Sequence, residues 1–250
     1  MMTLNQRLYQ LFEEKAQRVT IEILSLGLGY TAVTTSDGGI GLSYTYFGDK
    51  KSCMVLNEPI DYEAKPAILL LEKINSDNTV ERSMALALIN ALNYDTALAL
   101  PEDKDNKVMY KMLGLELDPN VAMVGYFGPL VKNFQTNRIP LEILDESRQL
   151  GQRTDFYRKL ENWADVLLLT STSILNQTTE EILAHVNEKV RTVMLGPSTP
   201  MVGQAFKHLP VRMLAGTVAT DKENILKAVR HGMGTPVLHR FSRKSFLWLD

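Results

Sequence analysis

The residues best placed to do chemistry lie in the turn Gly196-Pro-Ser-Thr-Pro200, which carries two hydroxyl groups. An apolar run from Val190 to Leu195 precedes this turn and predicts a buried strand. Thr199 followed by Pro200 predicts a helix with threonine as its N-cap and proline at its first position. A strand, a tight turn and a helix in this order point backbone N–H groups and the helix dipole at one space, where an anion or a developing oxyanion can bind. The alternative is that Ser198 and Thr199 only cap their own helix.

A second strand and turn lies upstream, where the run Val121–Val124 is followed by the turn Gly125–Pro129. A third apolar run, Ile139–Leu144, ends at Asp145, twenty residues after Gly125. In doubly wound folds a glycine at this point lets the backbone approach a dinucleotide, and an acidic residue about 20 positions later binds a ribose hydroxyl. Gly-Tyr-Phe-Gly departs from the motif Gly-x-Gly-x-x-Gly, however, and Pro129 stiffens the turn. The spacing therefore favours a Rossmann-like crossover more strongly than a bound dinucleotide.

The rest of the second half continues this alternation of strands and helices. Further strands are predicted at Ala164–Thr170 and Leu209–Ala215, and Thr-x-x-Glu spacing predicts capping boxes that begin at Thr178 and at Thr220. Such alternation predicts a mostly parallel sheet covered on both faces. The loops that follow parallel strands meet at one edge, where open α/β sheets bind ligands. We expect this edge to gather Gly125–Pro129, Asp145, Thr170–Ser173, Gly196–Thr199 and Gly216–Thr217.

The first half has a different pattern. Apolar residues at helical spacing predict a helix over Thr3–Gln17, and three short β-type segments follow it. Helices are then expected, the last one opened by Asn78-Thr-Val-Glu81 with capping-box spacing. We therefore predict a small α+β domain over residues 1–100, a connector over 100–120 with one short helix, and a Rossmann-like α/β domain over 101–250. The segments expected in the first half and the connector are the strands Val19–Leu26, Tyr30–Thr35 and Ile40–Tyr46, the hairpin turn Ser36–Gly39, and the helices Tyr62–Ile74, Val80–Leu92 and Lys107–Leu113.

Composition excludes several classes of function. The chain has 250 residues, 45% of them hydrophobic, and a formal net charge of −2, so no excess of basic residues argues for nucleic acid. Arg240, Arg243 and Lys244 form a short basic cluster that we interpret as a solvated tail. The sequence shows no signal peptide and no apolar run of membrane-spanning length. The single cysteine, Cys53, excludes internal disulfides and fits a reducing cytoplasm.

Metal sites and familiar hydrolytic triads also lack their sequence signatures. The four histidines have no partner at metal-ligand spacing, and neither Cys-x-x-Cys nor His-Glu-x-x-His occurs. Ser198 lies outside any Gly-x-Ser-x-Gly nucleophile elbow. We therefore expect no metal held by the protein, and any catalysis must come from carboxylates, hydroxyls and backbone donors. The four histidines are His185, His208, His231 and His239.

Several separated motifs resemble one family. They are Gly29-Tyr-Thr-Ala-Val33, Glu81-Arg82 with Ala87-Leu-Ile-Asn-Ala-Leu92, Met123-Val-Gly-Tyr-Phe-Gly-Pro-Leu130, Leu195-Gly-Pro-Ser-Thr-Pro200, and Leu214-Ala-Gly-Thr-Val218 with Asp221. They are similar to the prokaryotic family known as "putative heavy-metal chelation", whose activity is unassigned. The resemblance implies an enolase-N-terminal-like domain followed by a Rossmann-like domain. It further implies a pocket between the two domains for a heterocyclic (flavin- or pterin-like) or siderophore-like compound, on which the protein acts by condensation or hydrolysis.

Carried onto this sequence, the resemblance yields a set of candidate site residues. Glu81 and Asp145 are the candidate catalytic acid or base, and Ser198 is the catalytic candidate in the anion or oxyanion cradle. The alternative is structural: Glu81 and Asp221 serve helix N-termini, Asn90 is a satisfied buried amide, and Phe127 and Thr31 belong to the core and to an ordinary strand. The ligand-binding candidates are Thr31, Asn90, Gly125, Phe127, Gly128, Thr170, Ser171, Gly196, Thr199, Gly216 and Asp221.

Two classes of function remain open at this stage. One is an enzyme that acts on a planar or chelating small molecule, with a nucleotide-dependent enzyme such as an S-adenosylmethionine-using methyltransferase as the second choice. The other is a non-catalytic protein that carries a chelator or a metal complex. The expected partner is a small molecule, with no nucleic acid and no membrane; a homodimer is left open, and no cofactor is named. We also expect a cleft between the first hundred residues and the strand-end loops, lined by Gly196–Thr199 and Gly125–Gly128.

Overall fold

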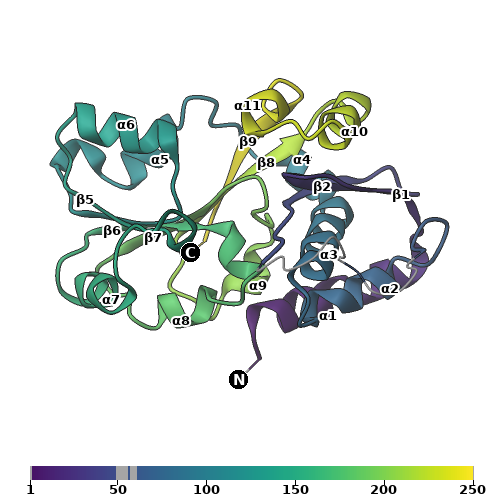
Figure 1. The fold of residues 1–250 in the computed structure, drawn as a ribbon, viewed down its shortest axis with the longest axis horizontal. Helices are drawn as coiled ribbons and strands as arrows, with labels where there is room; N and C mark the ends of the chain where they lie inside the picture. Colours follow the sequence, from purple (N-terminus) through teal and green to yellow (C-terminus); the bar gives the residue numbers. More distant parts are fainter. Residues whose placement is uncertain (1, 49–55, 57–60, 250) are drawn as a thin grey trace.

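The computed structural model describes residues 2–48, 56 and 61–249, and these residues form two sheets (Figure 1). The N-terminal unit, up to Ala99, packs a three-stranded antiparallel sheet of order β1-β2-β3 against helices. The C-terminal unit, from Val121 onward, contains a six-stranded sheet. The elements of the N-terminal unit are α1 (Leu4–Arg18), β1 (Ile21–Leu26), β2 (Tyr30–Thr35), β3 (Ile40–Tyr44), α2 (Ile68–Leu71), η1 (Glu72–Asn75), α3 (Thr79–Leu92) and α4 (Tyr94–Ala99).

Helix α3 lies directly on the small sheet because glycines face it. A Cβ atom on Gly41 would lie 2.1 Å from the carbonyl oxygen of Ala87, and one on Gly39 would lie 2.2 Å from that of Ala91. Gly38 supplies the positive φ of the predicted hairpin turn. Thr3 caps α1 with a complete capping box. The sequence therefore predicted this α+β unit correctly in its main elements.

Three local predictions in the N-terminal unit are wrong. The helix expected over Tyr62–Ile74 begins only at Ile68, because residues 63 and 66 form bridges with the start of β1. Strand β3 ends at Tyr44 rather than Tyr46. Asn78 caps α3 as predicted, but its own N–H donates to Ser76 Oγ (3.0 Å) rather than to Glu81.

The larger sheet has the order β5-β4-β6-β7-β8-β9, parallel through β8 and antiparallel at β9. The chain reverses its direction of winding between β4 and β6, which makes this point the topological switch of the sheet. The elements from the connector onward are α5 (Lys107–Met112), η2 (Leu115–Leu117), β4 (Val121–Val124), α6 (Gly128–Thr136), β5 (Leu141–Leu144), η3 (Glu146–Arg148), α7 (Arg153–Asn162), β6 (Val166–Thr170), η4 (Ser171–Ile174), α8 (Thr179–Leu183), β7 (Arg191–Leu195), α9 (Gly203–Phe206), β8 (Met213–Ala219), α10 (Lys222–Arg230), α11 (Thr235–Leu238) and β9 (Ser242–Trp248).

Both faces of this sheet are buried, as the sequence predicts. Met123 and Leu168 pack with residues of α5 and α6 on one face, while Leu167 and Met194 pack with residues of α7 to α9 on the other. The mixed α/β fold, with a small α+β unit before a Rossmann-like, mostly parallel sheet, is therefore confirmed. The division at residue 100 remains a prediction.

The basic cluster near the C-terminus is not a solvated tail. Arg243 and Lys244 lie in β9, and Arg243 donates to the carbonyls of Leu98 and Leu100. Lys244 Nζ lies 3.3 Å from Asn106 Oδ1. Arg240 lies just before the strand and is exposed. The prediction was wrong because an edge strand often carries charged residues, so its sequence pattern is hard to distinguish from that of a solvated polar tail.

The expected helix starts in the C-terminal unit also need correction. Asp221, not Thr220, caps α10, with its carboxylate accepting from Asn224 N at 3.1 Å. Thr178 Oγ1 donates to Asn176 Oδ1 (2.7 Å) instead of capping α8. Strand β8 begins at Met213 instead of Leu209 and extends to Ala219, so Gly216 and Thr217 lie inside a strand rather than in a loop.

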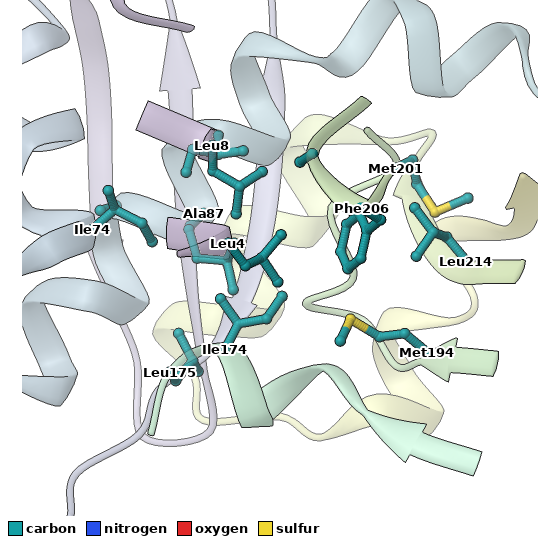
Figure 2. Packing of buried hydrophobic residues seen from close by; sticks show 14 of the residues in the cluster. Leu4, Leu8, Ile74, Ala87, Ile174, Leu175, Met194, Met201, Phe206 and Leu214 are labelled. Carbon is teal, nitrogen blue, oxygen red and sulfur yellow. The ribbon is translucent and has the colours of Figure 1, made fainter. Parts of the chain in front are cut away.

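The two units share one apolar interior. Figure 2 shows Leu4 of α1 beside Ile174, with Phe206 and Met201 close by on the side of the C-terminal unit. In addition, α10 packs against β1 and β2, where Ile225 of α10 belongs to the same buried cluster as Ala32 of β2. This shared interior fixes the N-terminal unit against the larger sheet. No helix within the described residues is long and apolar enough to cross a membrane, and Cys53 lies outside the described residues.

Candidate functional site at the carboxyl edge of the large sheet

Three loops pack against one another where β4, β6 and β7 end. We call Gly125–Gly128, Thr170–Thr172 and Gly196–Ser198 the strand-end loops. Gly125 has a φ of +86°, and a Cβ there would lie 3.0 Å from Thr170 Cβ. Gly196 has a φ of +127°, and a Cβ there would lie 2.9 Å from Ser171 Oγ. Both glycines are therefore required, one for each contact between neighbouring loops.

The strand-end loops carry neutral hydrogen-bonding groups. Thr170 Oγ1 lies 2.9 Å from Thr172 Oγ1 and accepts from Thr172 N. Thr170 thereby caps η4, which begins at Ser171 directly after β6. Ser171 is buried against Gly196. A ligand at this edge would meet hydroxyls and backbone N–H groups, which suit carbonyl, enol and ring-nitrogen acceptors.

The Gly196–Thr199 turn contacts the N-terminal unit directly. Ser198 Oγ accepts from Tyr44 N at 2.7 Å, and Asn90 Nδ2 donates to Leu42 O (2.8 Å) and to Ser198 O (3.3 Å). Asn93 Nδ2 also donates to Met201 O at 2.9 Å. The N-terminal unit therefore sits on the carboxyl edge of the parallel sheet. The half-buried amide of Asn90 donates to two backbone carbonyls, so it has a structural role whether or not it also contacts a ligand.

We call the junction between the two units, where Tyr44, Asn90 and Asn93 contact residues 198–201, the seam. The two hydroxyl residues of the turn are buried in it. Ser198 is 1% exposed and Thr199 is 2% exposed, and Thr199 Oγ1 has no hydrogen-bond partner among the described residues. Thr199 does not cap a helix, because α9 begins only at Gly203. The expected open cleft is therefore wrong for Ser198 and Thr199, whose side chains fill the junction. Gly196, Gly125 and Gly128 are only half-buried and form the accessible part of the edge.

Arg82 provides a further tie across the seam. This buried side chain of α3 donates from Nε to Leu175 O at 2.5 Å and from Nη1 to Ser76 O. Burial lowers the pKa of its guanidinium, and the negative charge of Asp77 opposes that shift. Leu175 directly follows η4, so Arg82 holds the segment after β6 in place. Although the sequence motif contained Arg82, its role was missed because no local pattern indicates a partner 93 residues away.

Glu81 does not reach the strand-end loops. Its carboxylate contacts Ser76 Oγ and lies 3.2 Å from Lys73 Nζ, at the start of α3. Glu81 therefore serves the helix N-terminus, as its structural alternative predicts.

Asp145 lies at the end of edge strand β5, next to Gly125. The N–H of Gly125 donates to Leu144 O at 2.9 Å, so Gly125 and Asp145 are neighbours at the ends of the paired strands β4 and β5. The Asp145 carboxylate accepts from Ser147 Oγ (2.6 Å) and from Arg148 N (3.1 Å). Arg148 in turn places its guanidinium 4.6 Å from the centre of the Tyr126 ring. Asp145 therefore caps its own turn while remaining at the ligand edge.

The other candidates divide between the edge and the interior. Phe127 packs against the core and accepts from Leu130 N and Val131 N as the N-cap of α6, next to Gly128. Thr31 is fully buried in β2 and shares a 2.9 Å hydrogen bond with Thr45. Gly216 lies inside β8, where a Cβ would lie 2.7 Å from Met201 Sδ. Asp221 caps α10, and its hydrogen bonds with Asn224 lower the pKa of its carboxyl.

One residue at this edge was missed entirely. Tyr44, at the end of β3, keeps 41% of its surface exposed although Ser43 and Thr45 on either side are fully buried. Its ring makes edge-to-face contacts with Tyr30 and Tyr46 at centroid distances of 6.1 and 6.2 Å. The alternation Tyr44-Thr-Tyr46 predicts a shared face for the two rings, but only the fold brings the backbone N–H of Tyr44 against Ser198 Oγ.

Direct metal binding finds no support in the side chains. Within the described ranges, no group of three or more His, Cys, Asp and Glu residues comes together in a way that could hold a metal ion. The carboxylates near the edge are engaged with their own turns. We therefore derive no chemical step through a metal held by these side chains.

Comparisons with known proteins agree with this fold. A family model described as "Putative heavy-metal chelation" matches residues 109–247, and a second model with the same description matches residues 9–93. An uncharacterized protein of Methanocaldococcus jannaschii is 20% identical over 255 aligned positions, which cover 96% of this chain and 95% of that protein.

Two solved structures of proteins of unknown function show the same architecture. One, from Pyrococcus horikoshii, has a TM-score of 0.81 at 20% identity and covers 99% of this chain and 100% of its own. The other, from Desulfitobacterium hafniense, has a TM-score of 0.74 at 18% identity and covers 97% and 98% of the two chains. At these identities the similarity establishes the fold.

Proposed function

Because the chain belongs to the family described as "Putative heavy-metal chelation", we propose that it binds a small heterocyclic (flavin- or pterin-like) or siderophore-like chelating compound at the strand-end loops. The observation that carries this proposal is the packing of three loops at the switch point of the sheet, with Gly125 and Gly196 in conformations that other residues rarely adopt. Glycine adopts these conformations without strain, and in doubly wound folds glycines at this edge let the backbone approach a ligand closely. A metal would then arrive as part of the chelate.

We further propose that the reaction is a condensation or a hydrolysis. Both reactions develop negative charge on an oxygen. The half-buried hydroxyls of Thr170 and Thr172 can stabilise it, whereas the N–H of Gly196 donates to Ala215 O (3.1 Å) and Pro197 has no N–H. Asp145 is the ionisable side chain next to Gly125, so it is our candidate for proton transfer. Glu81 is bound to Ser76 and Lys73 elsewhere, and Ser198 is covered, so neither is assigned a step. The proposal includes a cytoplasmic location. It names no partner other than this small molecule.

The test uses two threonine-to-valine variants. Mass spectrometry of the natively purified protein identifies any retained molecule, and a thermal-shift titration with that molecule, riboflavin or desferrioxamine B measures binding. Thr170→Val removes one hydroxyl from a strand-end loop and should weaken binding about tenfold, the effect of losing one hydrogen bond to a ligand. Thr34→Val is the matched control, because Thr34 Oγ1 is buried in β2 without a partner among the described residues. Equal affinities of the two variants would contradict the site.

A nucleotide-dependent enzyme, such as one using S-adenosylmethionine, is the second candidate. The contact between Gly125 N and Leu144 O favours it, because it sets Asp145 beside the glycine of the first crossover. Pro129 opposes it by removing a donor from the first turn of α6. Saturable binding of S-adenosylmethionine or a nicotinamide dinucleotide that Asp145→Ala abolishes would place this candidate first. Tight binding of a chelator without turnover would instead indicate a carrier.

A further inference from the structure

The end of β3 presents an exposed aromatic ring on a rigid support. Ser43 and Thr45 are fully buried, so the backbone on both sides of Tyr44 is fixed while the ring stays two-fifths exposed. The backbone N–H of Tyr44 is anchored in the other unit, on Ser198 Oγ at 2.7 Å. Exposed tyrosines on a fixed backbone lose little conformational entropy when a ligand binds, which makes them effective contacts.

The neighbouring tyrosines hold the Tyr44 ring without stacking on it. The planes of Tyr30 and Tyr46 are inclined by 88° and 79° to that of Tyr44. Tyr30 is fixed by a 2.5 Å hydrogen bond between its hydroxyl and Thr235 Oγ1, and burial raises the pKa of its phenol, so it stays neutral. Parallel stacking on the exposed part of Tyr44 is therefore left for another planar group.

A continuous row of contacts leads from the backbone of Tyr44 to the strand-end loops. Tyr44 N contacts Ser198 Oγ, the Ser198 turn begins at Gly196, and Gly196 packs on Ser171 Oγ, next to Thr170. Tyr44 therefore lies at the N-terminal side of the proposed site. A ligand that reaches from Thr170 past Gly196 arrives at Tyr44.

We propose that the ring of Tyr44 is a stacking platform, and that the ligand of the strand-end loops is consequently a planar conjugated ring system rather than a flexible chelator. This inference rests on the proposed function, because it assigns a second contact to the same ligand. It narrows the ligand to the flavin- or pterin-like class. It also makes the site bipartite: the C-terminal unit supplies hydrogen bonds, and the N-terminal unit supplies the aromatic face.

The test compares Tyr44→Ala with Tyr44→Phe in the full-length protein. Substitution leaves the backbone hydrogen bond to Ser198 intact, so both variants should fold. Fluorescence titration with riboflavin and with pterin should show affinity about tenfold or more weaker for Tyr44→Ala, in line with the loss of one stacked aromatic ring, and within twofold of wild type for Tyr44→Phe. Tyr157→Ala, which removes a ring stacked on His185, is the control for a tyrosine outside the site.

The outcomes separate this inference from the proposed function. If Tyr44→Ala binds a planar probe normally while Thr170→Val does not, the site stands and the platform is wrong. If wild type binds desferrioxamine B but neither riboflavin nor pterin, the planar class is wrong, and loss of that binding in Thr170→Val would still support the strand-end site. If none of these probes binds saturably to wild type, both ideas are overturned.

Discussion

Removing each of the two adjacent hydroxyls in the Gly196–Pro200 turn should change the stability of the protein differently. Ser198 Oγ accepts a 2.7 Å hydrogen bond from Tyr44 N, whereas Thr199 Oγ1 is buried with no partner among the described residues. Ser198→Ala leaves a backbone donor unsatisfied in the seam between the two units. Thr199→Val replaces an unpaired hydroxyl with a methyl group of the same shape. Ser198→Ala should therefore destabilise the protein, and Thr199→Val should be neutral or stabilising.

The magnitudes follow from the cost of an unsatisfied donor. Leaving a buried N–H unpaired costs about 1–3 kcal/mol, while removing a buried hydroxyl that lacks a partner recovers part of its desolvation cost. In a protein of this size, each kcal/mol shifts the melting temperature by about 2–4 °C. We therefore expect a fall of at least about 2 °C for Ser198→Ala and no fall for Thr199→Val.

Differential scanning calorimetry and urea unfolding measure these shifts, provided that circular dichroism and fluorescence give coincident transitions. A second transition in Ser198→Ala alone would show that the two units had uncoupled, which also follows from a seam role. The reasoning is refuted if Ser198→Ala unfolds like wild type, or if Thr199→Val loses as much stability as Ser198→Ala.

Three further predictions use other parts of the molecule. Burial, together with the positive charge of Arg7, lowers the pKa of His208 below its ordinary 6.5. Unfolding then takes up a proton, so the free energy of unfolding should fall as pH drops below about 6.5. His208→Gln should therefore reduce the dependence of the melting temperature on pH between pH 7 and 5. Parallel profiles for the variant and wild type would contradict this. Gly41→Ala should destabilise by more than about 2 kcal/mol because its Cβ would meet the α3 backbone, whereas Gly29→Ala, with no described atom within 4 Å, should be neutral in urea unfolding. Finally, calorimetric titration of the purified protein with zinc, nickel and cobalt should show only weak, poorly saturable binding, because the described residues bring no three such ligands together; a stoichiometric submicromolar site would refute this.

Local pattern and turn chemistry predicted most of the elements, because the central strands β4, β6 and β7 are almost wholly buried and each is bounded by turn residues. The errors occur where a long-range contact overrides a local signal. Thr199-Pro200 has the composition of a helix start, yet Thr199 and Met201 pack against Gly216, and α9 begins only at Gly203. Strand β9 was missed because its pairing with β8 joins residues that no short window contains.

The position of the candidate site could be predicted from the sequence. Which of its residues face a ligand and which hold the two units together could not. Parallel topology requires that the loops after β4, β6 and β7 meet, and they do. Which hydroxyl faces a ligand and which holds the two units together depends on how the N-terminal unit docks. That docking buries Ser198 and leaves Thr170 at the edge of the half-buried loops.

Docking also explains why the site needs both units. The parallel sheet alone would present an edge of hydroxyls and N–H groups to water, which competes for every one of them. Tyr44, carried to that edge on β3, adds apolar contact area that water does not compete for. Because the same backbone that carries Tyr44 is bonded to Ser198, any variant that loosens the seam also displaces the ring. Ligand affinity and the stability of the seam should therefore fall together in Ser198→Ala, whereas Tyr44→Phe should leave both unchanged.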